Sequence, residues 1–128
     1  MTDTEFLTVE DVLVASAAAT GMQPVVLDPG LLETVVFRPR ATVFGEPAYP
    51  DVHQQAAALL QSLIKNHPFQ DGDKRTALIS TLLFLGLNEW HSIASQDDLF
   101  DLVIAIATDD LPDATSIAER LRELTTRD

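Results

Sequence analysis

The chain contains no cysteine among its 128 residues. Disulfide frameworks, thiolate zinc sites and cysteine nucleophiles are therefore excluded, and a reducing compartment is permitted. Basic residues are also scarce, with 8 Lys and Arg against 20 Asp and Glu and a net charge of -12. A chain this acidic is repelled by the phosphates of nucleic acids, so we expect no nucleic-acid partner.

Long apolar runs are missing as well. The strongest run, residues 77–87, is interrupted by Ser80 and Thr81, and about 20 apolar residues are needed to cross a bilayer. The acidic start, residues 1–5, has neither the basic nor the apolar stretch of a secretory signal. We therefore expect a cytoplasmic protein without a membrane partner. Its length predicts one domain over residues 1–128.

Capping and turn residues divide the chain into about six predicted helices, which indicates an all-α bundle. N-cap signals stand at Thr8, Asp28, Asp51 and Ser95. The predicted helices cover residues 9–18, 29–37, 52–66, 74–85, 96–108 and 113–124, and Gly86 and Asn88 are expected to end the fourth. That fourth helix is apolar nearly all round, so we expect it to be buried in the middle of the fold.

Two other segments are less regular. Residues 38–50 hold three prolines and a glycine, so no helix is expected there. Residues 41–44 could form a short strand with Gly45 at the turn, which predicts a hairpin or flap that contacts something. Trp90 and His91 are expected in a turn with a packing role, and His53 is expected to have a surface or core role.

The few basic residues gather around one loop. Between residues 41 and 119 the only ones are Lys65, Lys74 and Arg75, which flank residues 67–73. A local positive cluster in a negative chain favours a small anionic ligand. The alternative is that these residues fell near a helix end by chance.

Residues 67–76 carry the chemistry. A glycine turn at Gly72 opens onto a helix N-terminus, which is a ready anion site. Asp71 offers the oxygen ligand that Mg²⁺ prefers beside phosphate oxygens. His67, with an ordinary histidine pKa of about 6.5, is the candidate general base. Together they indicate phosphoryl or nucleotidyl transfer. Taken singly, each has a plainer interpretation: a hydrogen-bonding histidine, a turn, and an N-cap at Asp73.

The order of these residues resembles the signature of the Fic/Doc family, His-x-Phe-x-Asp/Glu-Gly/Ala-Asn-Lys/Gly-Arg. Residues 74–78 resemble the Doc branch, the toxins of toxin–antitoxin pairs, and the likeness extends over roughly residues 7–122. The matching positions are His67, Phe69, Asp71, Gly72 and Arg75.

The resemblance implies an all-α Fic fold and an enzyme that uses ATP and Mg²⁺. Most Fic enzymes transfer AMP to a hydroxyl group of a protein. The Doc branch instead transfers the γ-phosphate to a threonine of elongation factor Tu, which stops translation.

The resemblance also implies a role for each matching residue. His67 would take the hydroxyl proton, and Asp71 would bind Mg²⁺. Phe69 would anchor the loop in the core. The phosphates would contact Gly72, Asp73, Lys74 and Arg75. The target's backbone would dock on a flap within residues 38–50, at Thr42, Val43 and Phe44.

Two positions depart from the family pattern. AMP-transferring members carry a second arginine where this chain has Leu78, which favours phosphate transfer over a Fic-type nucleotidyltransferase. Asp73 replaces the usual asparagine: its carboxylate would repel phosphates, help to hold Mg²⁺, or only cap a helix. Asp73 is also the one feature that favours a degenerate domain that only binds a partner.

Many family members are restrained by an inhibitory helix with the pattern Ser/Thr-x-x-x-Glu-Gly/Asn. This chain has no such stretch. The resemblance therefore implies a separate cognate antitoxin that supplies the helix in trans.

Overall fold

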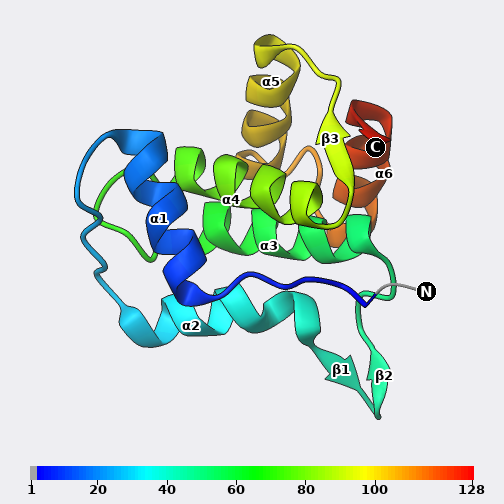
Figure 1. Ribbon diagram of the computed structural model, residues 1–128, viewed down its shortest axis with the longest axis horizontal. Coiled ribbons are helices and arrows are strands. Elements are labelled where there is room, and N and C mark those ends of the chain that lie inside the picture. Colours follow the sequence, from blue (N-terminus) through cyan, green and yellow to red (C-terminus); the bar gives the residue numbers. More distant parts are fainter. Residues whose placement is uncertain (1–2) are drawn as a thin grey trace.

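The computed structural model describes residues 3–128, and in that range it contains six α-helices and two small antiparallel strand pairs (Figure 1). The predicted all-α fold is confirmed. The helices are α1 (Val9–Thr20), α2 (Pro29–Phe37), α3 (Val52–Asn66), α4 (Asp73–Leu87), α5 (Gln96–Ala107) and α6 (Ala114–Leu124). The shorter elements are a 3₁₀ turn η1 (Arg38–Arg40) and the strands β1 (Thr42–Val43), β2 (Glu46–Pro47), β3 (Trp90–Ser92) and β4 (Thr125–Arg127).

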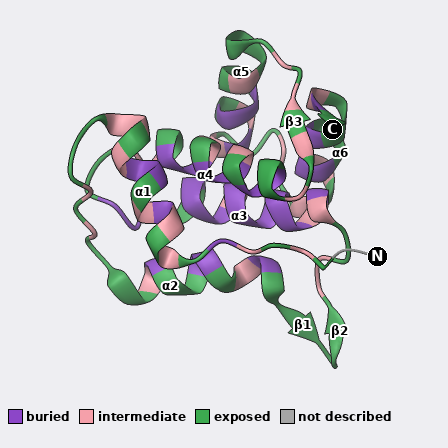
Figure 2. Ribbon diagram, in the orientation of Figure 1, coloured by how far each residue is buried: buried purple, intermediate pink, exposed green. Residues whose placement is uncertain are grey.

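Helix α3 lies at the centre of the fold (Figure 2). Ten of its 15 residues are buried, on more than one face of the helix. Three consecutive alanines, residues 56–58, are fully buried and let neighbouring helices approach closely. Helices α2, α4 and α6 pack around α3, and its C-terminal end leads directly into the loop at His67.

The predicted helix starts are confirmed by their side-chain caps. Each cap accepts a hydrogen bond from a backbone N–H of the first turn, which otherwise has no partner within the helix. The caps of α1, α2, α3, α5 and α6 are Thr8, Asp28, Asp51, Ser95 and Asp113.

Helix α4 departs from the prediction in two ways. It continues to Leu87 with Asn88 as its C-cap, so the expected helix end is confirmed at Asn88 but not at Gly86. The expectation of complete burial is also wrong, since Ile79 and Leu83 are each 39% exposed. In Figure 1 α5 rises away from α4, and a groove lined by Ile79 and Leu82 of α4 and Phe100 of α5 separates the two helices.

The sequence did not predict two short elements of the structure, η1 and β3. Residues 38–40 form η1, which tolerates Pro39 because the first turn of a helix leaves its N–H groups free. Trp90 and His91 lie in β3 rather than in a turn. This strand pairs with β4 at the other end of the chain, a partner that local sequence does not reveal.

The predicted hairpin is present. Strand β1 pairs with β2, and the two turn residues, Phe44 and Gly45, both have positive φ, 52° and 80°, as a type I′ turn requires. In Figure 1 the hairpin projects at the opposite end of the molecule from the connection between α3 and α4. Within residues 3–128, no helix is both long and apolar enough to cross a membrane.

Candidate active site

The connection between α3 and α4 is tied firmly to the core. It begins at His67, which ends α3 in the left-handed conformation with φ 49°. Phe69 is 2% exposed and bridges Val26, while the N–H of Gln70 donates to the carbonyl of Val25 at 2.9 Å. Phe69 therefore lies in the core, as predicted, and the loop is held between α3 and the segment before α2.

Gly72 brings the end of α1 against this loop. Its φ is 76°, a conformation that glycine adopts without strain. A Cβ at this position would lie 2.4 Å from Cγ2 of Thr20. Glycine is therefore required twice over, for the backbone conformation and for the close approach of α1.

Asp73 has a structural contact that the sequence did not predict. Gly72, not Asp73, is the N-cap of α4, so the N-cap interpretation of Asp73 is wrong. The Asp73 side chain instead reaches back across the loop, where Oδ1 accepts a hydrogen bond from the N–H of Phe69 at 3.1 Å. Its Oδ2 lies 3.7 Å from Nδ1 of His67. Asp73 thus braces the loop and faces the imidazole.

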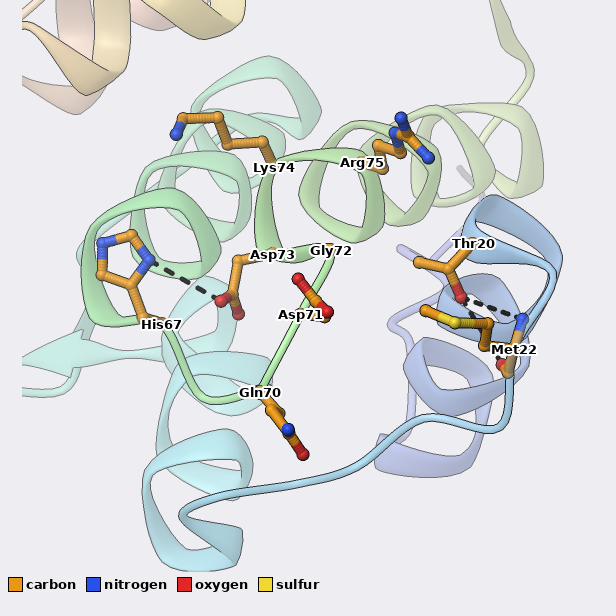
Figure 3. A pocket seen from close by; sticks show the side chains of 9 residues that line it. All are labelled: Thr20, Met22, His67, Gln70, Asp71, Gly72, Asp73, Lys74 and Arg75. Carbon is orange, nitrogen blue, oxygen red and sulfur yellow. Dashed lines mark hydrogen bonds and ion pairs between the residues drawn. The ribbon is translucent and has the colours of Figure 1, made fainter.

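The loop lines an open pocket of about 450 Å³ (Figure 3). The structure brings six of the predicted site residues together here, and three further residues complete the lining. Thr42, Val43 and Phe44 are not among them, because they lie in the β1–β2 hairpin at the other end of the molecule. The lining consists of Thr20, Met22, His67, Gln70, Asp71, Gly72, Asp73, Lys74 and Arg75.

The pocket is suited to an anion at the start of α4. No side chain in residues 3–128 caps the first-turn N–H groups of this helix, so they and the positive end of the helix dipole remain available. Lys74 and Arg75 are exposed and form no ion pair within the described part of the chain. In Figure 3 both extend outward from the first turn, away from Asp71 and Asp73.

The described residues contain no cluster of three or more His, Cys, Asp or Glu that could hold a metal ion by itself. Asp71 is an exposed carboxylate on the pocket wall. Mg²⁺ is commonly bound by one or two carboxylates together with substrate phosphates and water. The donor set therefore fits a magnesium ion that arrives with a phosphate-bearing substrate.

Sequence reasoning missed Thr20, Met22 and Gln70. Thr20 donates a hydrogen bond to the carbonyl of Ser16 at 2.9 Å and accepts one from the N–H of Met22 at 3.2 Å. These contacts place the end of α1 on the pocket wall. Thr20 and Met22 come from a segment about 50 positions before the loop, and no local pattern links them to it.

Comparison with known proteins identifies the family. Residues 4–85 match the family model described as "Fic/DOC family". The chain belongs to the Fic/Doc family. This Fic/Doc chain is 47% identical over 120 residues to "Toxin Doc" of Mycolicibacterium smegmatis, which covers 92% of each chain. It is 34% identical over 110 residues to "Protein kinase doc" of Escherichia phage P1, which covers 86% of this chain and 85% of the relative.

Both relatives place this Fic/Doc chain in the Doc branch, as its loop predicted. The whole candidate site, residues 20–75, lies inside the segment that matches the family model. Leu78, the position of the second arginine in AMP-transferring members, is half-buried against the core. Leu78 does not line the pocket and brings no cation to it.

Proposed function

We propose that this chain is a Doc-like toxin of a toxin–antitoxin pair that transfers the γ-phosphate of ATP to a protein hydroxyl. The acceptor would be a threonine of a translation factor such as elongation factor Tu, so that translation is inhibited. The observation that carries the proposal is the single pocket in which His67, Asp71 and the open N-terminus of α4 meet. The names of the two relatives, a toxin and a protein kinase, support it.

His67 would remove the proton of the acceptor hydroxyl. The acceptor oxygen would bond to the γ-phosphorus while the bond to the β-phosphate oxygen breaks, and ADP would leave with that electron pair. The Asp73 carboxylate faces Nδ1 of His67 at 3.7 Å.

The phosphates would contact Gly72, Lys74 and Arg75 at the start of α4. Arginine can bind two phosphate oxygens at once, whereas lysine acts as a point charge. Asp71 would hold Mg²⁺, whose charge, when the ion is bound, neutralises part of the charge on the phosphates. The absence of a second arginine at Leu78 favours this reaction over AMP transfer.

A cognate antitoxin would restrain the enzyme, because the chain itself lacks the inhibitory Ser/Thr-x-x-x-Glu-Gly/Asn pattern. We expect this antitoxin to supply its inhibitory helix in trans, in the cytoplasm. A test is growth arrest on expression of the chain, relieved by co-expression of the small protein encoded beside it.

The transferred group can be identified directly. The purified chain is incubated with elongation factor Tu or cell extract, Mg²⁺, and ATP labelled at either the γ- or the α-phosphate. We expect label on protein only from γ-labelled ATP, and a mass increase of one phosphate on the target. Label from α-labelled ATP would show AMP transfer instead. No label from either, with intact partner binding, would show a binding domain without activity.

A further inference from the structure

A second, smaller pocket of about 170 Å³ adjoins the candidate active site, and we call it the side pocket. It shares four lining residues with the larger pocket, namely Thr20, Met22, Gln70 and Asp71. The two volumes, about 450 and 170 Å³, together lie in the size range of small-molecule sites. The triphosphate of the proposed substrate would occupy the larger pocket, so the side pocket is available to another part of the nucleotide.

The wall of the side pocket belongs to the segment between α1 and α2, which is tied to the active-site loop. The N–H of Gln70 donates to the carbonyl of Val25 at 2.9 Å, and Val26 forms an antiparallel bridge with Phe69. The two segments are therefore paired over a few residues like neighbouring strands. This pairing fixes the wall relative to the loop that would hold the phosphates.

The pairing also decides which side chains of this wall face outward. Side chains of extended segments alternate between two faces. Phe69 is 2% exposed and Val26 packs against the core, so their neighbours Gln70 and Val25 lie on the outer face, where both are exposed. Gln23 is exposed as well and lines the same pocket. The side pocket thus has two amide groups, from Gln23 and Gln70, beside an aliphatic side chain.

Apolar side chains make the side pocket suitable for a flat ring. Met22 and Val25 are 55% and 52% exposed, and Pro24 lies between them in the lining. In Figure 3 the Met22 side chain extends from the end of α1 toward Asp71. A methionine thioether makes favourable contacts with aromatic rings. A nucleobase in this pocket would therefore have apolar contacts for its face and amide groups for its edge.

We propose that the side pocket binds the adenine base of the nucleotide, and that the amides of Gln23 and Gln70 pair with the edge of this base. The inference rests on the proposed function and names the residues that select the nucleotide. A glutamine amide offers a donor and an acceptor, which match the N7 acceptor and the N6 donor of adenine. Guanine presents two acceptors, N7 and O6, at the same edge, so one amide cannot satisfy both.

The groove between α4 and α5 also reaches the start of α4. It shares Lys74 and Arg75 with the larger pocket, whereas the side pocket shares four residues with it, among them the candidate metal ligand Asp71. The lining of the groove is largely apolar and includes the exposed residue Gln96. Gln96 is therefore a matched control, because it is a glutamine beside the same two cations but outside the side pocket.

Calorimetric titration with ATP, GTP and inorganic tripolyphosphate, each with Mg²⁺ and without an acceptor protein, tests the inference. With the unaltered chain, we expect ATP to bind about tenfold more tightly than GTP, as for one amide–base pair. The double variant Gln23→Met with Gln70→Met keeps the length of both side chains and removes both amides. It should bind ATP and GTP equally, and it should bind tripolyphosphate as the unaltered chain does, because the phosphate contacts remain.

Gln96→Met should keep the full preference for ATP. Thermal melts establish that each variant folds, as expected for changes at exposed side chains. If the double variant does not fold, Gln23→Met and Gln70→Met are measured singly, and each should lower the ratio of ATP to GTP affinity.

Equal binding of ATP and GTP by the unaltered chain would overturn the inference, as would an ATP preference that survives in the double variant or is lost in Gln96→Met. Loss of tripolyphosphate binding in the double variant would also overturn it, because the glutamines would then contact phosphate rather than the base. Transfer to protein is measured separately with γ-labelled ATP and GTP. An ATP preference in binding without any transfer would contradict the proposed function and leave the base site standing. Transfer at equal rates from ATP and GTP, without a binding preference, would do the reverse.

Discussion

At the scale of single residues, the candidate site depends on backbone conformations that few residue types tolerate. His67 has φ 49°, a left-handed conformation that costs most non-glycine residues about 1–2 kcal/mol and that asparagine adopts more readily. Phe44, Glu89 and Asp109 also have positive φ, and histidine, like asparagine and aspartate, adopts this conformation more often than other residue types with a side chain.

His67→Asn is therefore the informative change at this position. We expect phosphate transfer to fall by about 10²–10⁴, because proton removal is lost, while the melting temperature stays within a few degrees. Labelled transfer and thermal melts measure the two effects on the same preparation. His67→Ala serves as the comparison and should also lower stability by roughly 1 kcal/mol, since alanine tolerates left-handed backbone poorly. Full activity in His67→Asn would refute the general-base role.

Asp73 combines two effects that two variants can separate. Asp73→Asn keeps an oxygen for the N–H of Phe69 but removes a negative charge from the pocket. We expect unchanged stability and a transfer rate or nucleotide affinity raised about ten- to a hundredfold, the size of one charged contact in a partly buried site. Asp73→Ala should instead destabilise the protein by about 1–3 kcal/mol, because the Phe69 N–H loses its partner.

Transfer rates over a range of Mg²⁺ concentrations, together with thermal melts, show whether the Asp73 carboxylate repels phosphate, binds the metal or has a structural role alone. A lower rate and a higher Mg²⁺ requirement in Asp73→Asn would show that the carboxylate binds the metal together with Asp71. A rate and Mg²⁺ dependence that do not change would leave Asp73 with its structural role alone.

At the scale of secondary-structure elements, the loop is positioned by the packing of α1 against the start of α4. The contact is closest at Gly72, where a Cβ would lie 2.4 Å from Cγ2 of Thr20. A hydrogen bond between the hydroxyl groups of Thr76 and Ser16, at 3.0 Å, joins the same two helices. The geometry of the pocket thus depends on a helix that lies outside the sequence motif.

Gly72→Ala should destabilise the protein by more than the roughly 1–2 kcal/mol of left-handed strain, because the new methyl group also meets Thr20. The second variant, Gly72→Ala with Thr20→Ser, removes the obstructing methyl and keeps the hydroxyl that bonds Ser16. We expect it to recover the steric part of the loss and to retain the backbone part. Denaturant unfolding of the single and double variants gives the coupling. Strict additivity would argue against the contact between α1 and α4.

At the scale of the whole molecule, the C-terminal strand β4 packs against the beginning of α3, where Thr125 contacts His53. His53 is 5% exposed, and its ring meets Trp90 of β3 edge-on at 4.5 Å. The Thr125 hydroxyl donates to the carbonyl of Leu121 at 2.8 Å, so Nε2 of His53, 2.9 Å away, is the donor to that hydroxyl. The buried ring therefore carries a hydrogen on Nε2.

This arrangement makes stability depend on pH. Burial lowers the pKa of His53 below its ordinary value of 6.5, and the Arg122 charge lowers it further against a smaller opposing effect of Asp51. The unfolded chain binds a proton more readily, so this contribution is complete above about pH 6.5 and is lost as the pH falls below it. We expect the free energy of unfolding to drop between pH 7 and pH 5, by up to about 1.4 kcal/mol per pH unit.

His53→Gln is the control for this pH dependence, since its side-chain amide can still donate to Thr125 but does not titrate. Denaturant unfolding at a series of pH values should give a smaller slope for His53→Gln than for the unaltered chain. Identical slopes would assign the effect to other groups, such as the carboxylates.

The sequence by itself determined the interactions between residues that are close together in the chain. Helix caps such as Thr8 and Asp51 bond three residues ahead, and the type I′ turn at Phe44–Gly45 depends on adjacent residues. The residues from His67 to Arg75 are consecutive, so the sequence alone was enough to predict an anion site, a metal ligand and a general base among them. The tertiary structure decided what depends on distant partners: the strand pair β3–β4, the uncovered face of α4, and the bond from Asp73 to Phe69 in place of a helix cap. It also decided that Thr20 lines the pocket and that Gln23 lines the side pocket together with Gln70, because only packing brings segments far apart in the chain into contact.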